Sequence, residues 1–270
     1  MPTAFTGALR HEWIRLRSLR TTWLLLFAAL ASNGLIALAV TTDMHNGTRS
    51  PADPENIVSV LTGASGVAPA SITALLAGVL GALAGGQDYR HRTIQATFLA
   101  VPRRGVLFSA KLAVISMWAV LFAGLSFGTS YAVAVGRLGE SWGSASLSDA
   151  SVHRPLLGYL ALTVLTAWLG AGLAGVFRRV SAAAFALIAL PLLIEPGIIW
   201  LLRRHTGSWV NTVADHLPFT AGQQMINLPG GDGPGNNLVV AGAVAGGLTF
   251  LALVAAATAL SGAMLVSRDS

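Results

Sequence analysis

The chain contains no cysteine and unusually few charged residues. Without cysteine it can form no disulfide, thiolate metal site or cysteine nucleophile. Charged residues make up 10% of the chain, against about 25% in a typical soluble domain. Hydrophobic residues make up 54%, and the mean hydropathy is +0.66. These values predict an integral membrane protein.

Motifs for nucleotide binding and for catalysis are also missing. There is no G-x-x-x-x-G-K-[ST] phosphate loop, and the only lysine, Lys111, lacks a glycine-rich approach. The six histidines show no H-E-x-x-H spacing, and no G-x-S-x-G elbow occurs. We therefore expect no enzyme, no metal site and no cofactor in this chain. The net charge of +6 does not indicate a nucleic-acid binder, because such proteins gather their charge on one exposed face.

Long apolar runs predict an all-α membrane protein, with the whole chain, 1–270, as one domain. Each run is long enough to cross about 30 Å of hydrocarbon at about 1.5 Å per helical residue. The six predicted spans are 22–40, 66–86, 106–135, 155–177, 181–202 and 237–266. Most of the seventeen basic residues then lie on the side of the N-terminus, so we expect both termini in the cytoplasm.

Residues 3–20 are patterned as an amphipathic helix at the inner membrane surface. Apolar residues recur at spacings of three and four, with charged residues on the other sides. We expect Trp13 at the depth of the lipid headgroups and Arg17 near anionic lipid. The apolar positions are Phe5, Leu9, Trp13, Leu16 and Leu19, and the charged ones are Arg10, Glu12, Arg15, Arg17 and Arg20.

One intramembrane charge stands out: Glu195, between Pro191 and Pro196. A carboxylate at mid-helix costs about 2.5 to 3.5 kcal/mol on insertion scales, so it should face a partner or a wet cavity. One interpretation is that Glu195 lines a translocation route. The other is that it lies near the outer end of the span and pairs with Arg203 or Arg204.

Two interruptions on the outer side differ in character. Residues 41–65 are polar and rich in turn formers, so we expect a loop. Residues 208–227 mix apolar and polar side chains, which fits either short re-entrant helices that cap the outer side of a route or a plain loop. Gly81 and Gly85 have the G-x-x-x-G spacing, as do Gly242 and Gly246. We interpret both pairs as helix packing within the chain.

The most specific signal is the polar segment 87–105, QDYRHRTIQATFLAVPRRG, between the second and third predicted spans. It resembles the loop of type-2 ABC exporter permeases, where E-Y-R-x-G-T-I is followed by a segment ending near P-R-R. Asp88 stands where that family usually has glutamate, and Arg92 stands where it often has glycine. The resemblance covers the whole chain in architecture, but only this loop carries a motif.

The resemblance implies a bacterial permease in the cytoplasmic membrane, with a cytoplasmic coupling helix in this loop. It also implies two copies of a partner ABC ATPase, which would hold ATP and Mg²⁺, and a second permease subunit, as a homodimer. Arg178 and Arg179 would form a second, shorter inner contact. The residues implied in ATPase docking are Asp88, Tyr89, Arg90, Arg92, Thr93, Ile94 and Phe98.

Three functions are therefore held open. The first is export of a small amphipathic molecule, such as an antibiotic, a peptide or a lipid-like metabolite. The second is a permease that removes a compound from the bilayer. The third is a membrane anchor or assembly factor that recruits a cytoplasmic protein and transports nothing.

Overall fold

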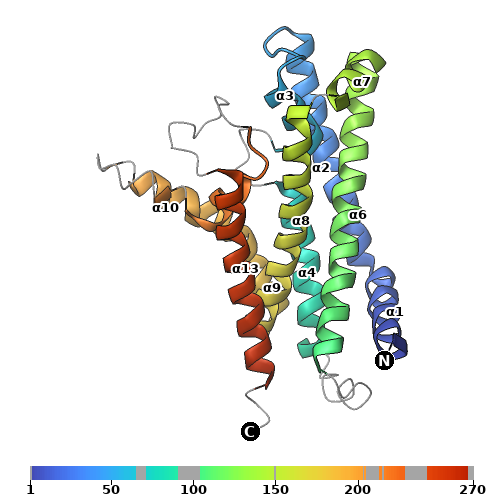
Figure 1. Cartoon of the computed structure of the whole chain (residues 1–270), viewed down its shortest axis with the longest axis vertical. Helices are drawn as coiled ribbons and strands as arrows, with labels where there is room; N and C mark the ends of the chain where they lie inside the picture. Colours follow the sequence, from blue (N-terminus) through green and yellow to red (C-terminus); the bar gives the residue numbers. More distant parts are fainter. Residues whose placement is uncertain are drawn as a thin grey trace.

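The computed structural model describes residues 2–64, 71–90, 104–148, 150–202, 204, 213–214, 216–228 and 242–266. All regular structure in these ranges is helical, which confirms the all-α prediction (Figure 1). The helices are α1 (Pro2–Ser18), α2 (Arg20–His45), α3 (Pro54–Thr62), α4 (Ile72–Arg90), α6 (Arg104–Leu138), α7 (Glu140–Ser148), α8 (Ala150–Phe177), α9 (Val180–Ala189), the π-helical turn η1 (Leu190–Ile194), α10 (Glu195–Leu202), α12 (Pro218–Gln223) and α13 (Ala243–Val266).

Five helical segments within the described residues are long and apolar enough to cross a membrane. They are Arg20–His45, Leu107–Leu138, Ser151–Phe177, Val180–Leu202 and Ala243–Gly262. They correspond to five of the six predicted spans and indicate a membrane protein. The remaining prediction, 66–86, overlaps α4, whose apolar part among the described residues is Ile72–Gly86; residues 66–70 lie outside the described residues. At 1.5 Å per residue this part is about 22 Å long, shorter than the hydrocarbon core, so a sixth span stays a prediction.

The helices form a bundle with two distinct ends (Figure 1). The end of α4, the start of α6 and the end of α13 lie at the end where α1 packs, which we name the α1 end. The helices α3 and α7 lie at the opposite end, which we name the α3 end. Residues 91–103, between α4 and α6, thus connect two helices at the α1 end.

The packing of α4 against α8 forms the centre of the bundle. A side chain on Gly81 would overlap the carbonyl oxygen of Ala167, and one on Gly170 would overlap that of Gly78. A Cβ on Gly85 would lie 2.7 Å from the carbonyl oxygen of Ala171. Backbone contact this close requires small residues along the interface. The structure therefore confirms that the first G-x-x-x-G pair serves packing within the chain.

Helix α1 packs mainly against α6, through the stripe that the sequence predicted. Leu16 is fully buried, and the Trp13 ring stacks on Trp118 with their centroids 5.1 Å apart. Glu12, which the sequence places outside the apolar stripe, is nevertheless buried, with 3% of the residue exposed. Glu12 forms an ion pair with Arg15 at 2.9 Å. The physical reason is that neighbouring helices cover more of α1 than its apolar stripe.

The interpretation of residues 41–65 as a loop was wrong in part, because α3 occupies 54–62 and is largely buried. Its limits are set locally: Asp53 accepts a hydrogen bond from the Glu55 amide at 3.0 Å, Pro54 is the first helical residue, and Gly63 ends the helix with φ +64°. These are the usual signals of a helix start and stop. Together with the apolar run that lies between them, these start and stop signals would have been enough to predict α3.

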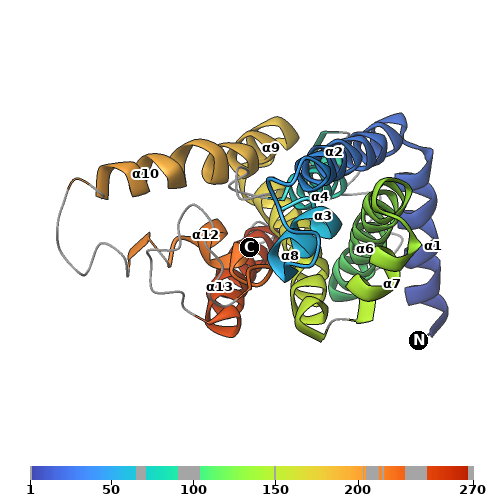
Figure 2. The ribbon, with the colours of Figure 1, turned by 90° about the horizontal axis from the view of Figure 1, so that it is seen from above.

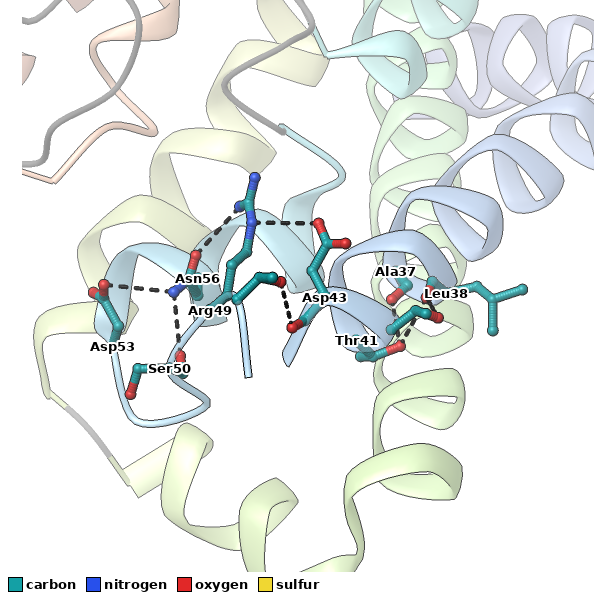
Figure 3. Close-up of polar contacts among 10 residues, drawn as sticks. Ala37, Leu38, Thr41, Asp43, Arg49, Ser50, Asp53 and Asn56 are labelled. Atoms are coloured by element: carbon teal, nitrogen blue, oxygen red, sulfur yellow. Dashed lines mark hydrogen bonds and ion pairs between the residues drawn. The ribbon is translucent and has the colours of Figure 1, made fainter. Parts of the chain in front are cut away.

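The turn that leads into α3 is held by polar contacts (Figure 3). The guanidinium group of Arg49 lies 3.5 Å from a carboxylate oxygen of Asp43 and donates a hydrogen bond to the Asn56 side chain at 3.3 Å. The Asn56 amide in turn donates to the Ser50 carbonyl oxygen at 3.1 Å. Trp142 in α7 donates from its indole to the carbonyl oxygen of Pro51, and so joins α7 to this turn.

Candidate functional site

The predicted docking segment begins on a helix. Helix α4 continues through Arg90, so the backbone of Asp88, Tyr89 and Arg90 forms its last turn. Arg92, Thr93, Ile94 and Phe98 lie outside the described residues. What the structure describes of the segment is therefore its two ends, the last turn of α4 and residues 104–105 at the start of α6, both at the α1 end (Figure 1).

The second predicted contact, Arg178 and Arg179, forms the turn between α8 and α9. Arg178 adopts a left-handed backbone with φ 55°, and its amide donates to the carbonyl oxygen of Ala174 at 2.9 Å, which ends α8. Arg179 is exposed. A Cβ on Gly86 in α4 would overlap the side chain of Val180, the first residue of α9. The structure thus brings the two predicted inner contacts onto helices that touch each other.

Helix α1 holds α4 from another direction. The Arg15 guanidinium group donates a hydrogen bond to the Ala84 carbonyl oxygen at 2.8 Å, one turn before Asp88. Arg17 is exposed, and its carbonyl oxygen accepts a hydrogen bond from the Trp23 indole at 2.9 Å. Trp13 makes a packing contact with α6, and its depth relative to lipid headgroups stays a prediction.

Glu195 is buried, with 3% of the residue exposed, at the junction of η1 and α10. One carboxylate oxygen accepts a hydrogen bond from the Phe219 amide at 2.7 Å. The other accepts from the Thr220 amide at 2.8 Å and from the Thr220 hydroxyl at 2.9 Å. Pro191 lies in the π-helical turn just before Glu195, where the regular hydrogen bonding of the span is interrupted.

The carboxylate completes the start of α12, which has no capping side chain of its own. Leu217 occupies the capping position and cannot accept a hydrogen bond through its side chain. Pro218 at the first helical position lacks an amide proton, so the next two amides, Phe219 and Thr220, are the ones that need an acceptor. A helix start with an apolar residue followed by proline offers no local acceptor for the next amides. This pattern was the signal that could have predicted a distant carboxylate partner.

The segment that contains α12 lies beside α13 (Figure 2). The Phe219 ring packs edge-on against Phe250 in α13, with centroids 5.4 Å apart. A Cβ on Gly158 in α8 would overlap the carbonyl oxygen of Met225, and one on Gly246 in α13 would overlap that of Ala221. Residues 218–228 are thus packed against the bundle, unlike a plain loop. The rest of the predicted segment is described only at 213–214 and 216–217.

The proposed pairing of Glu195 with an arginine finds no support among the described residues. Arg204 lies over the Trp200 ring, with its guanidinium carbon 3.8 Å from the ring centroid. Arg203 lies outside the described residues. The position of Glu195 on a translocation route stays a prediction. No group of three His, Asp or Glu residues in the described part of the chain is arranged to hold a metal ion.

No family model matches the sequence, and no curated protein matches it significantly.

Proposed function

We propose that this chain is the membrane-spanning subunit of an ATP-driven exporter of the type-2 ABC class. The observation that carries the proposal is the way α4 is held where it enters the basic segment 87–105. Arg15 of α1 binds the carbonyl oxygen of Ala84, and Val180 of α9 packs against Gly86. A partner that pushed on the segment would therefore act on three helices together.

The same packing offers a physical route by which such a push would reach the α3 end. Helix α4 contacts α8 backbone to backbone at Gly81 and Ala167, and α8 contacts the α12 segment at Gly158 and Met225. Close-packed contacts of this kind shift as a unit and do not deform gradually. Partner closure would thus bias two arrangements of the helices, which is how a chain without a nucleotide site can use the energy of ATP.

In this proposal the α1 end faces the cytoplasm, and two ATPase copies dock on the segments 87–105 and 178–179. Its basic residues match the excess of arginine expected on the inner side of a membrane. The subunit pairs with a second copy of itself, and the cargo is a small amphipathic or lipid-like molecule. Glu195 would belong to the outer side of the route, where it holds the α12 segment against α8 and α13.

Co-purification tests the proposal. We would express the chain with its neighbouring reading frames, solubilise it gently and identify stoichiometric partners by mass spectrometry. An ATPase that is retained by the native chain and lost from an Arg90→Glu, Arg92→Glu double variant is the expected result. Arg137→Glu, at the α3 end of α6, is the matched control and should keep the partner.

The alternative, a membrane anchor or assembly factor, makes a different prediction. Such a protein would retain a cytoplasmic partner without ATPase activity, and vesicles containing the complex would show no ATP-dependent movement of cargo. Absence of any ATPase partner from the native preparation would overturn the proposal.

A further inference from the structure

The N-terminal helix α1 turns a basic side away from the bundle. Its apolar stripe, which the sequence pattern predicted at the membrane surface, is packed on the protein: Leu16 is fully buried, and Trp13 stacks on Trp118 of α6. Helix α1 runs mainly across the long axis of the bundle, beside α6 (Figure 2). The side that remains outside carries Arg10 and Arg17, which lie two turns apart on one helix face.

No exposed acidic side chain offsets this charge. Glu12 is the only acidic residue before Asp43 in the sequence, and it is buried in an ion pair with Arg15. Arg17 and, at the start of α2, Arg20 are exposed. The exposed charged side chains at the junction of α1 and α2 are therefore all basic.

The outer face of α2 changes from basic to apolar within two turns. Arg20, Leu24 and Phe27 recur at spacings of four and three, so they lie on one face of the helix. Leu24 is 67% exposed and Phe27 is 71% exposed. Because α2 is long and apolar enough to cross a membrane, hydrocarbon is the surrounding that suits these two side chains. Arg20 then lies at the headgroup end, where the apolar face begins.

Trp23 joins the basic end of α1 to this face. Its indole nitrogen donates a hydrogen bond to the Arg17 carbonyl oxygen at 2.9 Å, and its ring meets Trp118 edge-on with the centroids 5.8 Å apart. Trp23 is nevertheless 51% exposed. Tryptophan is enriched at the depth of the lipid headgroups, because its ring is largely apolar and its N–H is polar. The hydrogen bond fixes the backbone of Arg17 beside Trp23, so Arg17 and Arg20 both lie where the apolar face of α2 begins.

We propose that the junction of α1 and α2 binds an anionic phospholipid, whose headgroup is held by Arg17 and Arg20 and whose acyl chains lie along Leu24 and Phe27. Charge complementarity favours an anionic headgroup over a zwitterionic one, since each basic side chain near a membrane surface adds attraction to anionic lipid. A soluble acidic protein fits less well, because it would also have to cover the apolar face that begins one turn away. The site requires only that α2 crosses a membrane, and it is independent of the proposed transport function.

Native mass spectrometry of the purified full-length chain tests the site. The delipidated protein would be titrated with phosphatidylglycerol and, separately, with phosphatidylcholine that has the same acyl chains. We expect tighter binding of phosphatidylglycerol, and a loss of about fivefold or more in that affinity for the Arg17→Gln, Arg20→Gln double variant. Arg137→Gln, Arg204→Gln is the matched control, because it removes two exposed arginines outside the junction and should bind as the native chain does.

A charge-conserving variant separates attraction of the headgroup from a change in the fold. Arg17→Lys, Arg20→Lys keeps both positive charges and should restore most of the preference for phosphatidylglycerol. In the native chain, phosphatidylglycerol with a photoreactive group on its acyl chain should label the peptide that contains Leu24 and Phe27. Equal affinity for the two lipids, equal losses in the glutamine variant and the matched control, or no recovery in the lysine variant would each overturn the proposal.

The same variants show whether the basic side belongs to a protein partner. Unchanged lipid binding by Arg17→Gln, Arg20→Gln, together with loss of a co-purifying protein, would assign the surface to that partner and overturn the lipid site. Absence of photolabelling from the peptide that contains Leu24 and Phe27 would overturn it as well.

Discussion

The Glu195 carboxylate lies 2.7 Å from the amide nitrogen of Phe219, and this contact joins two segments that are 24 positions apart. Glu195 belongs to the α9–η1–α10 span, which is one of the two least buried of the five candidate spans. Phe219 belongs to the short helix α12, which packs against α8 and α13. The carboxylate therefore ties a peripheral span to the interior of the bundle.

Loss of this carboxylate should loosen α12 before it affects the rest of the bundle. In Glu195→Ala the buried amide of Phe219 and the partly buried amide of Thr220 lose their acceptor. Hydrogen bonds to charged groups contribute about 1.5–3 kcal/mol each, so for the three bonds to Glu195 we expect a loss of at least roughly 2–3 kcal/mol, even after local relaxation. Hydrogen exchange followed by mass spectrometry should show faster exchange over 218–223.

Glu140→Ala, which removes an exposed carboxylate from the first turn of α7, is the control and should leave exchange in α12 unchanged. Unaltered protection of residues 218–223 in Glu195→Ala would show that α12 is held by packing alone. Glu195→Gln should fall between the two, because the amide oxygen keeps one acceptor while its nitrogen faces the α12 donors.

The contact between α4 and α8 predicts a strong dependence on glycine at one position. In Gly81→Ala the new methyl group would overlap the carbonyl oxygen of Ala167, so the two helices must separate. Overpacking of this kind costs about 1–3 kcal/mol. We expect a lower thermal unfolding midpoint in detergent for Gly81→Ala. Gly124→Ala, on a face of α6 where a Cβ meets no atom within 4 Å, should show no loss. Equal midpoints for the two variants would contradict the close approach.

The sequence was sufficient to predict those structural features that depend on long apolar runs and local periodicity. Five spans, the N-terminal helix and the packing role of Gly81 follow from patterns within a single segment. It did not predict that Glu12 is buried, because periodicity identifies the apolar side of a helix and not how much of the opposite side a neighbour covers. The pairing of Arg15 with Ala84 joins segments 69 positions apart, and no local pattern specifies it.

The same division between what local patterns specify and what they do not holds for the site around Glu195. Glu195 was identified from the sequence because a carboxylate between prolines in an apolar run is unusual. Its hydrogen-bond partners could not be identified from the sequence, since two of the three hydrogen bonds come from backbone amides, which every residue except proline possesses. Helix α3 is a different case: the signals at Asp53, Pro54 and Gly63 were present, but the polar residues before them favoured a loop.

The turn between α8 and α9 contains a backbone strain that can be relieved. Arg178 has φ 55°, a conformation that costs an L residue with a Cβ about 1 kcal/mol or more relative to glycine. Arg178→Gly should therefore raise the thermal unfolding midpoint, whereas Arg178→Ala keeps the strain and should not. If the ATPase docks on this turn, Arg178→Gly should also weaken partner retention while it stabilises the chain. A lower midpoint for Arg178→Gly than for Arg178→Ala would contradict this assignment of the strain.

The ion pair of α1 predicts unequal effects for two arginines that are two positions apart. Arg15 pairs with the buried Glu12 at 2.9 Å and also bonds the Ala84 carbonyl oxygen, whereas the Arg17 side chain is exposed. In Arg15→Met the Glu12 carboxylate would be left buried without its partner, at a cost of about 1–3 kcal/mol. In Arg17→Met we expect almost no loss of stability.

The double variant Glu12→Gln, Arg15→Met separates the ion pair from the bond to α4. Neutral glutamine removes the buried charge, so the double variant should recover much of the stability lost in Arg15→Met. Proteolysis at the α1–α2 junction should nevertheless stay faster than in the native chain, because the bond from Arg15 to Ala84 is still missing. No recovery in the double variant would mean that the link to α4, and not the charge on Glu12, sets the importance of Arg15.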